Sequence, residues 1–128
     1  MQATLLFLFF IGMLGDSFTT FLGIVGALGT QLGNPDDIGN YAFAAIGTSV
    51  ITGLNLFTLD VFERKNRIIF MLWAPAVIVD FITSLIGSFT FIKSGANLLL
   101  AYLLVFVITM FITASPAMFR YIQKNPIY

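Results

Sequence analysis

The chain has 128 residues, of which 59% are hydrophobic and only 9% are charged, and its formal net charge is +0 at pH 7. Charged residues make up about 25% of an ordinary soluble domain, so this composition is typical of a protein that lies almost wholly in a lipid bilayer. The sequence has no Cys and no His, which excludes disulfides, thiol catalysis and imidazole-based catalytic, zinc or haem sites. The balanced charge also argues against nucleic acid as a partner.

Four apolar runs are long enough to cross the hydrocarbon core of a membrane, which is about 30 Å thick and takes about 20 helical residues. They cover residues 3–28, 41–62, 68–92 and 98–119. The connecting segments are short and polar, and Asn40 and Asn97 stand where helix N-caps are expected. We therefore expect an all-α fold, an integral membrane four-helix bundle that forms a single transmembrane domain over residues 1–128 and has the lipid bilayer as its main partner.

Basic residues are distributed unevenly among the connecting segments. Most of them fall between the second and third runs or after the fourth, namely Arg64, Lys65, Arg67, Arg120 and Lys124. Lys93 alone falls in the other segments. Because loops rich in Lys and Arg stay in the cytoplasm, we expect both termini to be cytoplasmic.

The two halves of the sequence share a pattern of small and polar residues. The motif Gly-x-x-x-Asp-x-x-Thr-Thr-x-x-Gly begins at Gly12, and the motif Ala-x-x-x-Asp-x-x-Thr-Ser-x-x-Gly begins at Ala76, 64 residues later. Thr52 and Thr109 each end a shared Val-Ile-Thr triplet. We interpret this pattern as a duplicated helical hairpin, whose copies are related by a pseudo-two-fold axis along the membrane normal. The two halves would be residues 1–66 and 67–128.

Each copy of the motif places one acidic residue near the middle of an apolar run. Asp16 falls in the first run and Asp80 in the third, and since these runs cross in the same direction, we expect both side chains at a similar depth. An ionised Asp at the bilayer centre costs about 2.5–3.5 kcal/mol, so it must face the bundle interior, a partner or a wet cavity. Helical spacing places further hydroxyl and amide groups on inward faces, namely Thr19, Thr20, Thr52, Asn55, Thr83, Ser84 and Thr109.

Small residues flank both Asp residues at helical spacing. Such residues let neighbouring helices approach closely in a membrane. The packing residues that we expect at these contacts are Gly12, Gly23, Gly26, Ala76 and Gly87.

Two carboxyl groups that lie close together in a low dielectric cannot both be charged cheaply. They would share a proton or bind a hard cation such as Na⁺, for which hydroxyl and amide oxygens are suitable further ligands. Two other roles stay open. The Asp residues would either be protonated and hydrogen-bonded across helices as packing groups, or contact another subunit or a ligand. The sequence has no pattern for a cofactor, a metal centre or a catalytic nucleophile, so we expect no enzyme.

The stretch Asp16-Ser17-Phe18-Thr19-Thr20, followed by Gly23 and by Asn34-Pro35, resembles a signature of small prokaryotic four-helix membrane proteins of unknown function. In that signature an acidic residue precedes Asn-Pro, whereas Gly33 stands there in this chain. The resemblance implies a prokaryotic inner membrane as the location, and it implies no activity.

These features lead to two functional hypotheses. The first is a proton- or cation-handling component of a transporter or channel, built around Asp16 and Asp80. Because a chain of 14.1 kDa has little room for a pathway, we expect a homo-oligomer in this case. The alternative is a non-catalytic accessory subunit of a larger membrane complex, whose minimal loops and Phe-rich surface pack against other subunits.

Overall fold

The computed structural model describes residues 1–29, 33, 35–65, 67–92, 95 and 97–126, and within these residues it contains helices and no β-strand. The elements are α1 (Gln2–Ala27), the 3₁₀ turn η1 (Pro35–Asp37), α2 (Ile38–Leu56), α3 (Thr58–Arg64), α4 (Arg67–Phe89) and α5 (Leu98–Lys124). The all-α fold class expected from the sequence is confirmed. Lys93 and Asn34, on which the predicted topology and the resemblance partly depend, lie outside the described residues.

Three helices, α1, α4 and α5, are long and apolar enough to cross a membrane. They correspond to the predicted runs 3–28, 68–92 and 98–119, and α5 continues to Lys124. The predicted run 41–62 is not one helix, because it is divided into α2 and α3. α2 is absent from the candidate spans found in the described part of the chain. Its apolar character is reduced by polar residues, namely Asn40, Thr48, Ser49, Thr52 and Asn55.

The break between α2 and α3 lies at Phe57. The main-chain N–H of Phe57 donates to Leu54 O at 3.0 Å, three residues back, which is the tighter pattern of a 3₁₀ turn. Thr58 Oγ1 donates to Asn55 O at 2.6 Å, and it accepts a hydrogen bond from Trp73 Nε1 at 2.9 Å. Hydroxyl groups that bond to the preceding turn compete with the regular ladder and bend helices. Side-chain contacts to α4 therefore accompany the end of α2.

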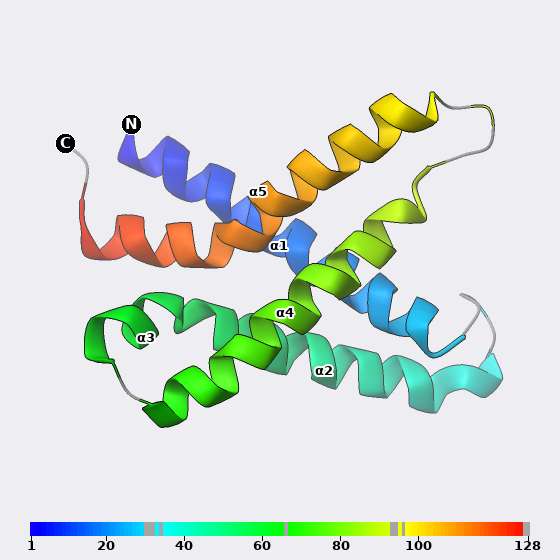
Figure 1. Cartoon of the computed structure of the whole chain (residues 1–128), viewed down its shortest axis with the longest axis horizontal. Helices are drawn as coiled ribbons and strands as arrows, with labels where there is room; N and C mark the ends of the chain where they lie inside the picture. The colour runs from blue at the N-terminus through cyan, green and yellow to red at the C-terminus, as the bar shows by residue number, and fades with distance from the viewer. Residues whose placement is uncertain (30–32, 34, 66, 93–94, 96, 127–128) are drawn as a thin grey trace.

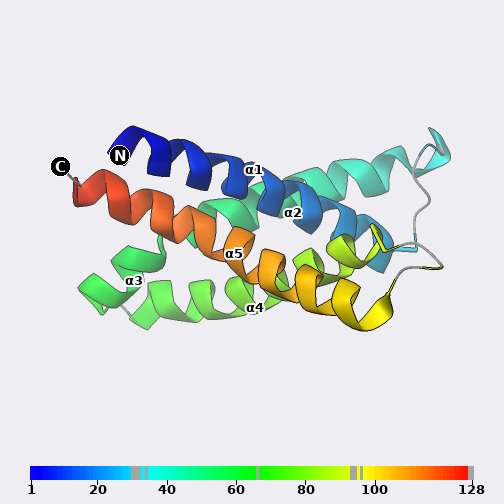
Figure 2. The same cartoon turned by 90° about the horizontal axis from the view of Figure 1, so that it is seen from above.

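The helices form an antiparallel arrangement with two distinct ends (Figure 1). Both termini, α3 and the start of α4 lie at one end. The end of α1, the start of α2, the end of α4 and the start of α5 lie at the other, as the second view confirms (Figure 2). α1 makes its most extensive contacts with α4 and α5. The middle of α1 is therefore the centre of the molecule.

Helix starts agree with the predicted N-caps in one case only. Asn97 caps α5, since its side chain accepts a hydrogen bond from Leu100 N at 3.3 Å. The predicted cap at Asn40 is wrong, because α2 begins two residues earlier, at Ile38, and follows η1 directly. The Pro-Asp-Asp turn supplies the start of this helix instead.

The interior is polar and the surface is apolar. Two carboxyl and several hydroxyl side chains are almost fully buried, namely Asp16, Thr20, Asp80, Ser84, Thr109 and Ser115. Large apolar side chains such as Phe7, Met71 and Leu99 are exposed. This arrangement is the reverse of that in a water-soluble protein, and it suits a chain whose surface faces lipid and whose polar groups must find partners inside.

α1 and α4 approach each other through glycines. A Cβ atom added at Gly23 would lie 1.8 Å from the main-chain oxygen of Thr83, and one added at Gly87 would lie 2.0 Å from that of Thr19. In each helix the Thr and the Gly are four residues apart, the spacing of the small-xxx-small contacts of membrane helices. Only glycine permits this closeness, which brings the polar side chains beside the crossing into contact.

Candidate functional site

The buried aspartates Asp16 on α1 and Asp80 on α4 form the centre of the site. Asp16 is 0% exposed and Asp80 is 1% exposed. Their carboxyl groups are linked through the side chains of Thr20 and Ser84, so the two groups lie close together. The structure thus brings together two residues that are separated by 64 positions in the sequence.

Two hydroxyl groups bridge the carboxyl groups. Thr20 Oγ1 donates to Asp80 Oδ1 at 2.7 Å, and Ser84 Oγ lies 3.1 Å from Asp16 Oδ1 as a donor. The two hydroxyl oxygens lie 2.9 Å apart, and either of them can be the donor in this contact. Since a hydroxyl group has a single proton, the one that donates here must accept a hydrogen bond from its carboxyl group instead of donating to it. The result is a continuous chain of four side chains in the order Asp80, Thr20, Ser84, Asp16.

Each carboxyl group receives one further donor from a second helix. Asn55 Nδ2 on α2 donates to Asp80 Oδ2. Thr113 Oγ1 on α5 lies 3.4 Å from Asp16 Oδ1. Each Asp is therefore contacted by two side chains from the other half of the sequence. Each carboxyl group thus contacts one hydroxyl group across the α1–α4 crossing and one further side chain. That further side chain is the amide of Asn55 for Asp80 and the hydroxyl of Thr113 for Asp16.

Two buried acceptors at the site are not satisfied. Asp16 Oδ2 and Asn55 Oδ1 have no hydrogen-bond donor among the residues that the structure describes. A buried acceptor without a partner costs about 1–3 kcal/mol, so such atoms usually indicate a missing proton, ion, water or ligand. These two oxygens could accept hydrogen bonds from at least one more donor.

The other predicted site residues lie around this centre without bonding the carboxyl groups. Thr19 Oγ1 donates to the main-chain oxygen of Asp16 at 3.1 Å, and Thr83 Oγ1 donates to that of Asp80 at 3.1 Å. Thr52 is paired with Ser17 at 3.0 Å. Thr109 donates to Ser88 Oγ at 3.2 Å. These four threonines satisfy their own hydroxyl groups within or between helices, as buried hydroxyl groups must.

The predicted packing residues divide into two kinds. Gly12, Gly23 and Gly87 each have a neighbour less than 3.0 Å from an added Cβ atom, so their contacts require glycine. Ala76 is buried. Gly26 is exposed, and an added Cβ atom would meet only Ile86 Cγ2, at the ordinary distance of 3.8 Å. The close crossing therefore extends along α1 as far as Gly23 and not to Gly26.

Thr113 and Ser88 are polar contacts that the predicted set lacks. Thr113 follows Thr109 by one helical turn, and the sequence spacing already places both residues on one inward face of the fourth run. Ser88 is four residues after Ser84 on α4 and could have been found in the same way. Neither residue has a counterpart in the repeated motif, which explains why the motif alone does not lead to them.

One pocket is lined by two of the side chains that contact the aspartates. It has a volume of about 320 Å³, and its lining includes Asn55 and Thr113, the second-helix donors to the two carboxyl groups. Most of its other lining residues are apolar, among them Val77, Phe81 and Met110. Asp16 and Asp80 do not line this pocket and are almost fully buried beside it.

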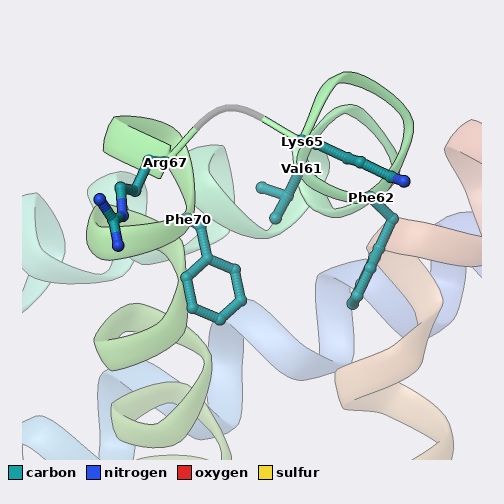
Figure 3. Close-up of a pocket in the computed structure, with 5 residues that line it drawn as sticks. All are labelled: Val61, Phe62, Lys65, Arg67 and Phe70. Carbon is teal, nitrogen blue, oxygen red and sulfur yellow. The ribbon is translucent and has the colours of Figure 1, made fainter.

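A separate pocket of about 500 Å³ lies at the junction of α3 and α4 (Figure 3). Val61, Phe62 and Phe70 form its apolar wall, and Lys65 and Arg67 stand beside it. In Figure 3 the ammonium of Lys65 and the guanidinium of Arg67 point to opposite sides. Because these cations do not converge, the pocket is a weaker candidate than the aspartate pair for a site that binds a single ion.

No family model, curated protein or solved structure matches this chain. The function is therefore inferred from the geometry of the aspartate pair.

Proposed function

We propose that this chain is an integral membrane four-helix bundle that handles a proton or a hard cation at Asp16 and Asp80, as a component of a small transporter or channel. α2 and α3 together would form the fourth span. The bundle would consist of two duplicated hairpins, a view supported by the reciprocal contacts between the halves. Both termini would face the cytoplasm, since Lys65, Arg67 and Arg120 follow the positive-inside rule. A prokaryotic inner membrane would be the location.

The observation that carries this proposal is the unbroken series of short oxygen–oxygen contacts between the two carboxyl groups. The chain has three links: Asp80 to Thr20, Thr20 to Ser84, and Ser84 to Asp16. Each link needs one proton, and the two hydroxyl groups supply only two. A third proton on one of the carboxyl groups completes the chain. The geometry therefore favours an aspartate pair that holds one proton and one negative charge.

The same chain of hydrogen bonds would let the proton move between the two carboxyl groups. With the proton on Asp16, the hydrogen bonds run from Asp16 through Ser84 and Thr20 to Asp80. With the proton on Asp80, all three bonds reverse while the oxygens stay in place, since the Thr20–Ser84 contact accepts either direction. A carboxyl pair near the middle of a membrane that can hold one proton on either group is suited to a proton-handling site. Because both aspartates are expected at a similar depth, the reversal itself moves the proton between α1 and α4 and not across the membrane.

Flux measurements would test the proposal. The purified protein would be reconstituted in liposomes containing a pH-sensitive dye, and proton uptake would be driven by a potassium diffusion potential. We expect uptake by the unmodified protein and a loss of at least about tenfold in the double variant Asp16→Asn, Asp80→Asn, because amides cannot exchange the proton. A Na⁺-sensitive dye in the same liposomes, with an inward Na⁺ gradient, would detect Na⁺ as the ion instead.

A matched control separates this effect from general damage. Ser49 is exposed on α2 and donates only to Ala45 O in its own helix, so Ser49→Ala should leave the flux unchanged. Circular dichroism and gel filtration of the double Asn variant would show whether it keeps its fold. If the folded double variant still conducts at the level of the unmodified protein, the proposal is wrong.

The second candidate function, an accessory subunit or homo-oligomer contact, is favoured by the composition of α2. This helix is less apolar than the three candidate spans, and the added Cβ atoms at Gly39 and Gly53 would meet nothing within 4 Å. Exposed small residues in a membrane helix are suited to close contact with another helix. Gentle extraction from the native membrane, followed by mass determination, would test this. Stoichiometric foreign chains would support an accessory subunit, and a homogeneous homo-oligomer would support the transporter.

A further inference from the structure

The pocket at the junction of α3 and α4 combines an apolar wall with exposed basic side chains (Figure 3). Its volume of about 500 Å³ is within the usual range for small-molecule pockets. Val61 is buried in its wall, whereas Phe62 and Phe70 are 62% and 48% exposed. These exposed rings offer apolar surface that another molecule can cover.

An aromatic cluster holds this wall in place. The ring centroid of Trp73 lies 5.3 Å from that of Phe62 on α3 and 5.8 Å from that of Phe70 on α4. The indole N–H of Trp73 donates to Thr58 at 2.9 Å, so α3 and α4 are joined at this point. Trp is enriched where a membrane meets water. The pocket therefore suits the level of lipid headgroups, at the end of the bundle where both termini lie (Figure 1).

The pocket carries an excess of positive charge. Its described lining includes the exposed side chains of Lys65 and Arg67 and no acidic residue. The carboxylates of α3, Asp60 and Glu63, are bound by Lys124 of α5 at 3.1 and 3.2 Å. Within the part of the chain that the structure describes, neither Lys65 nor Arg67 forms an ion pair. An anionic group would therefore be attracted to the pocket without displacing an internal partner.

Lys65 ends α3 in a conformation that is unusual for a residue with a side chain. Its φ is 51° and its ψ is 35°, which is the left-handed region. Glycine is the usual residue at this position after a helix, because it has no Cβ atom to clash with the main chain. A lysine here costs stability, so its ammonium group is a candidate for a binding role at the pocket that it lines.

The two cations do not form a site for a small free anion. In Figure 3 the ammonium of Lys65 and the guanidinium of Arg67 point to opposite sides. A free phosphate ion would contact one of them at a time, and a single exposed ion pair contributes little. A molecule whose apolar part covers Phe62 and Phe70 would gain binding from the wall as well. The occupant should therefore be an amphiphile with a negatively charged head.

We propose that this pocket binds an anionic phospholipid of the surrounding membrane. An acyl chain would lie against Phe62 and Phe70, and Lys65 and Arg67 would attract the phosphate headgroup. This inference goes beyond the proposed function, because it concerns a surface that the aspartates do not line. It requires a chain embedded in a membrane, but it does not require ion flux.

Quenching of Trp73 by brominated acyl chains would measure lipid binding at the wall. Trp73 is the single Trp of the chain, and its ring packs against those of Phe62 and Phe70. The full chain would be reconstituted in phosphatidylcholine nanodiscs that contain increasing fractions of dibrominated phosphatidylglycerol or of dibrominated phosphatidylcholine. We expect half-maximal quenching at an at least about fivefold lower fraction of the anionic lipid. Equal quenching by the two lipids would overturn the inference.

Matched charge variants test the location. Arg67→Gln removes a cation that lines the pocket, and Arg120→Gln removes an exposed cation that lines a different pocket. The preference for the anionic lipid should fall about fivefold in Arg67→Gln and stay unchanged in Arg120→Gln. Lys65→Gly removes the other cation and relieves the left-handed main chain, so it should lower the preference without loss of stability. If neither pocket variant changes the preference, or if Arg120→Gln lowers it equally, the inference is wrong.

Competition distinguishes a lipid from a free phosphate ion as the occupant. Sodium chloride at matched ionic strength measures how far screening alone weakens the attraction. Excess inorganic phosphate should relieve the quenching by dibrominated phosphatidylglycerol no more than this salt does. Relief that is specific to phosphate would identify a free anion as the occupant and would overturn the proposed lipid.

Discussion

Replacing Gly23 by Ala tests whether the close crossing of α1 and α4 holds the polar centre together. The added Cβ atom would lie 1.8 Å from Thr83 O, whereas an ordinary contact needs at least 3.4 Å, so the helices must separate locally by about 1.6 Å. Such a shift would stretch the Thr20–Asp80 hydrogen bond of 2.7 Å well beyond 3.5 Å. The substitution should therefore disturb both the packing and the hydrogen-bonded chain.

The expected cost follows from three contributions. Overpacking a close contact costs about 1–3 kcal/mol. The weakened hydrogen bond inside the membrane adds about 0.6–2 kcal/mol. Ala favours a helix over Gly by about 1 kcal/mol, which offsets part of this cost. Together these contributions should lower the free energy of unfolding of Gly23→Ala by about 0.6–4 kcal/mol.

Unfolding of the protein in mixed micelles by increasing amounts of SDS would measure this difference. The single Trp, Trp73, offers a fluorescence signal beside α3. Gly26→Ala is the matched control, because its Cβ atom would meet only Ile86 at 3.8 Å. This control should be neutral or stabilising by up to about 1 kcal/mol. If Gly23→Ala and Gly26→Ala change stability equally, the account of the crossing is wrong.

Three further substitutions probe other parts of the account. Gly87→Ala should lower the free energy of unfolding by about 1–3 kcal/mol in the same SDS titration, because its Cβ atom would lie 2.0 Å from Thr19 O; a neutral result would contradict the reciprocal crossing. Thr20→Val keeps the shape of the side chain but breaks the chain of hydroxyl groups, so proton flux should fall at least about tenfold in a folded protein, and unchanged flux would exclude this proton path. Asn97→Ala removes the side-chain cap of α5 and should cost about 0.5–2 kcal/mol by SDS titration, whereas no loss would show that the cap is dispensable.

The sequence was sufficient to locate the aspartate pair because its signal is local and repeated. Asp16 and Asp80 each interrupt an apolar run, and a charged residue there must turn inward. The 64-residue offset pairs Thr20 with Ser84, and these are the two hydroxyl groups that join the carboxyl groups in the structure. Helical spacing thus predicts which side chains can meet when two equivalent helices cross.

The interruption of the second apolar run could not be predicted in the same way. Local hydropathy favours a continuous helix over 41–62, and no Pro breaks it. The break at Phe57 accompanies contacts with α4, in which Asn55 bonds to Asp80 and Thr58 bonds to Trp73. Such contacts depend on the tertiary arrangement, which overrides local preference.

The sequence pattern also could not predict which partner each hydroxyl group bonds to. Thr52 and Thr109 each end a Val-Ile-Thr triplet, yet their hydroxyl groups pair with Ser17 and Ser88 instead of the carboxyl groups. The helix face on which a residue lies restricts which side chains can be its neighbours. It does not determine which of several nearby donors and acceptors the residue bonds to. The hydrogen-bond partner is determined by the geometry of the helix crossing, which depends on where glycine permits close contact.

The most direct test of the account is whether the aspartate pair holds a proton at neutral pH. Infrared spectroscopy resolves the C=O stretch of a protonated carboxyl group from the bands of carboxylates, and the shift of this band in D₂O identifies it. The account predicts such a band, equivalent to one proton per chain, that disappears in the double variant Asp16→Asn, Asp80→Asn. A spectrum without this band in the unmodified protein, or a band that persists in the folded double variant, would contradict the shared proton on which the proposed function depends.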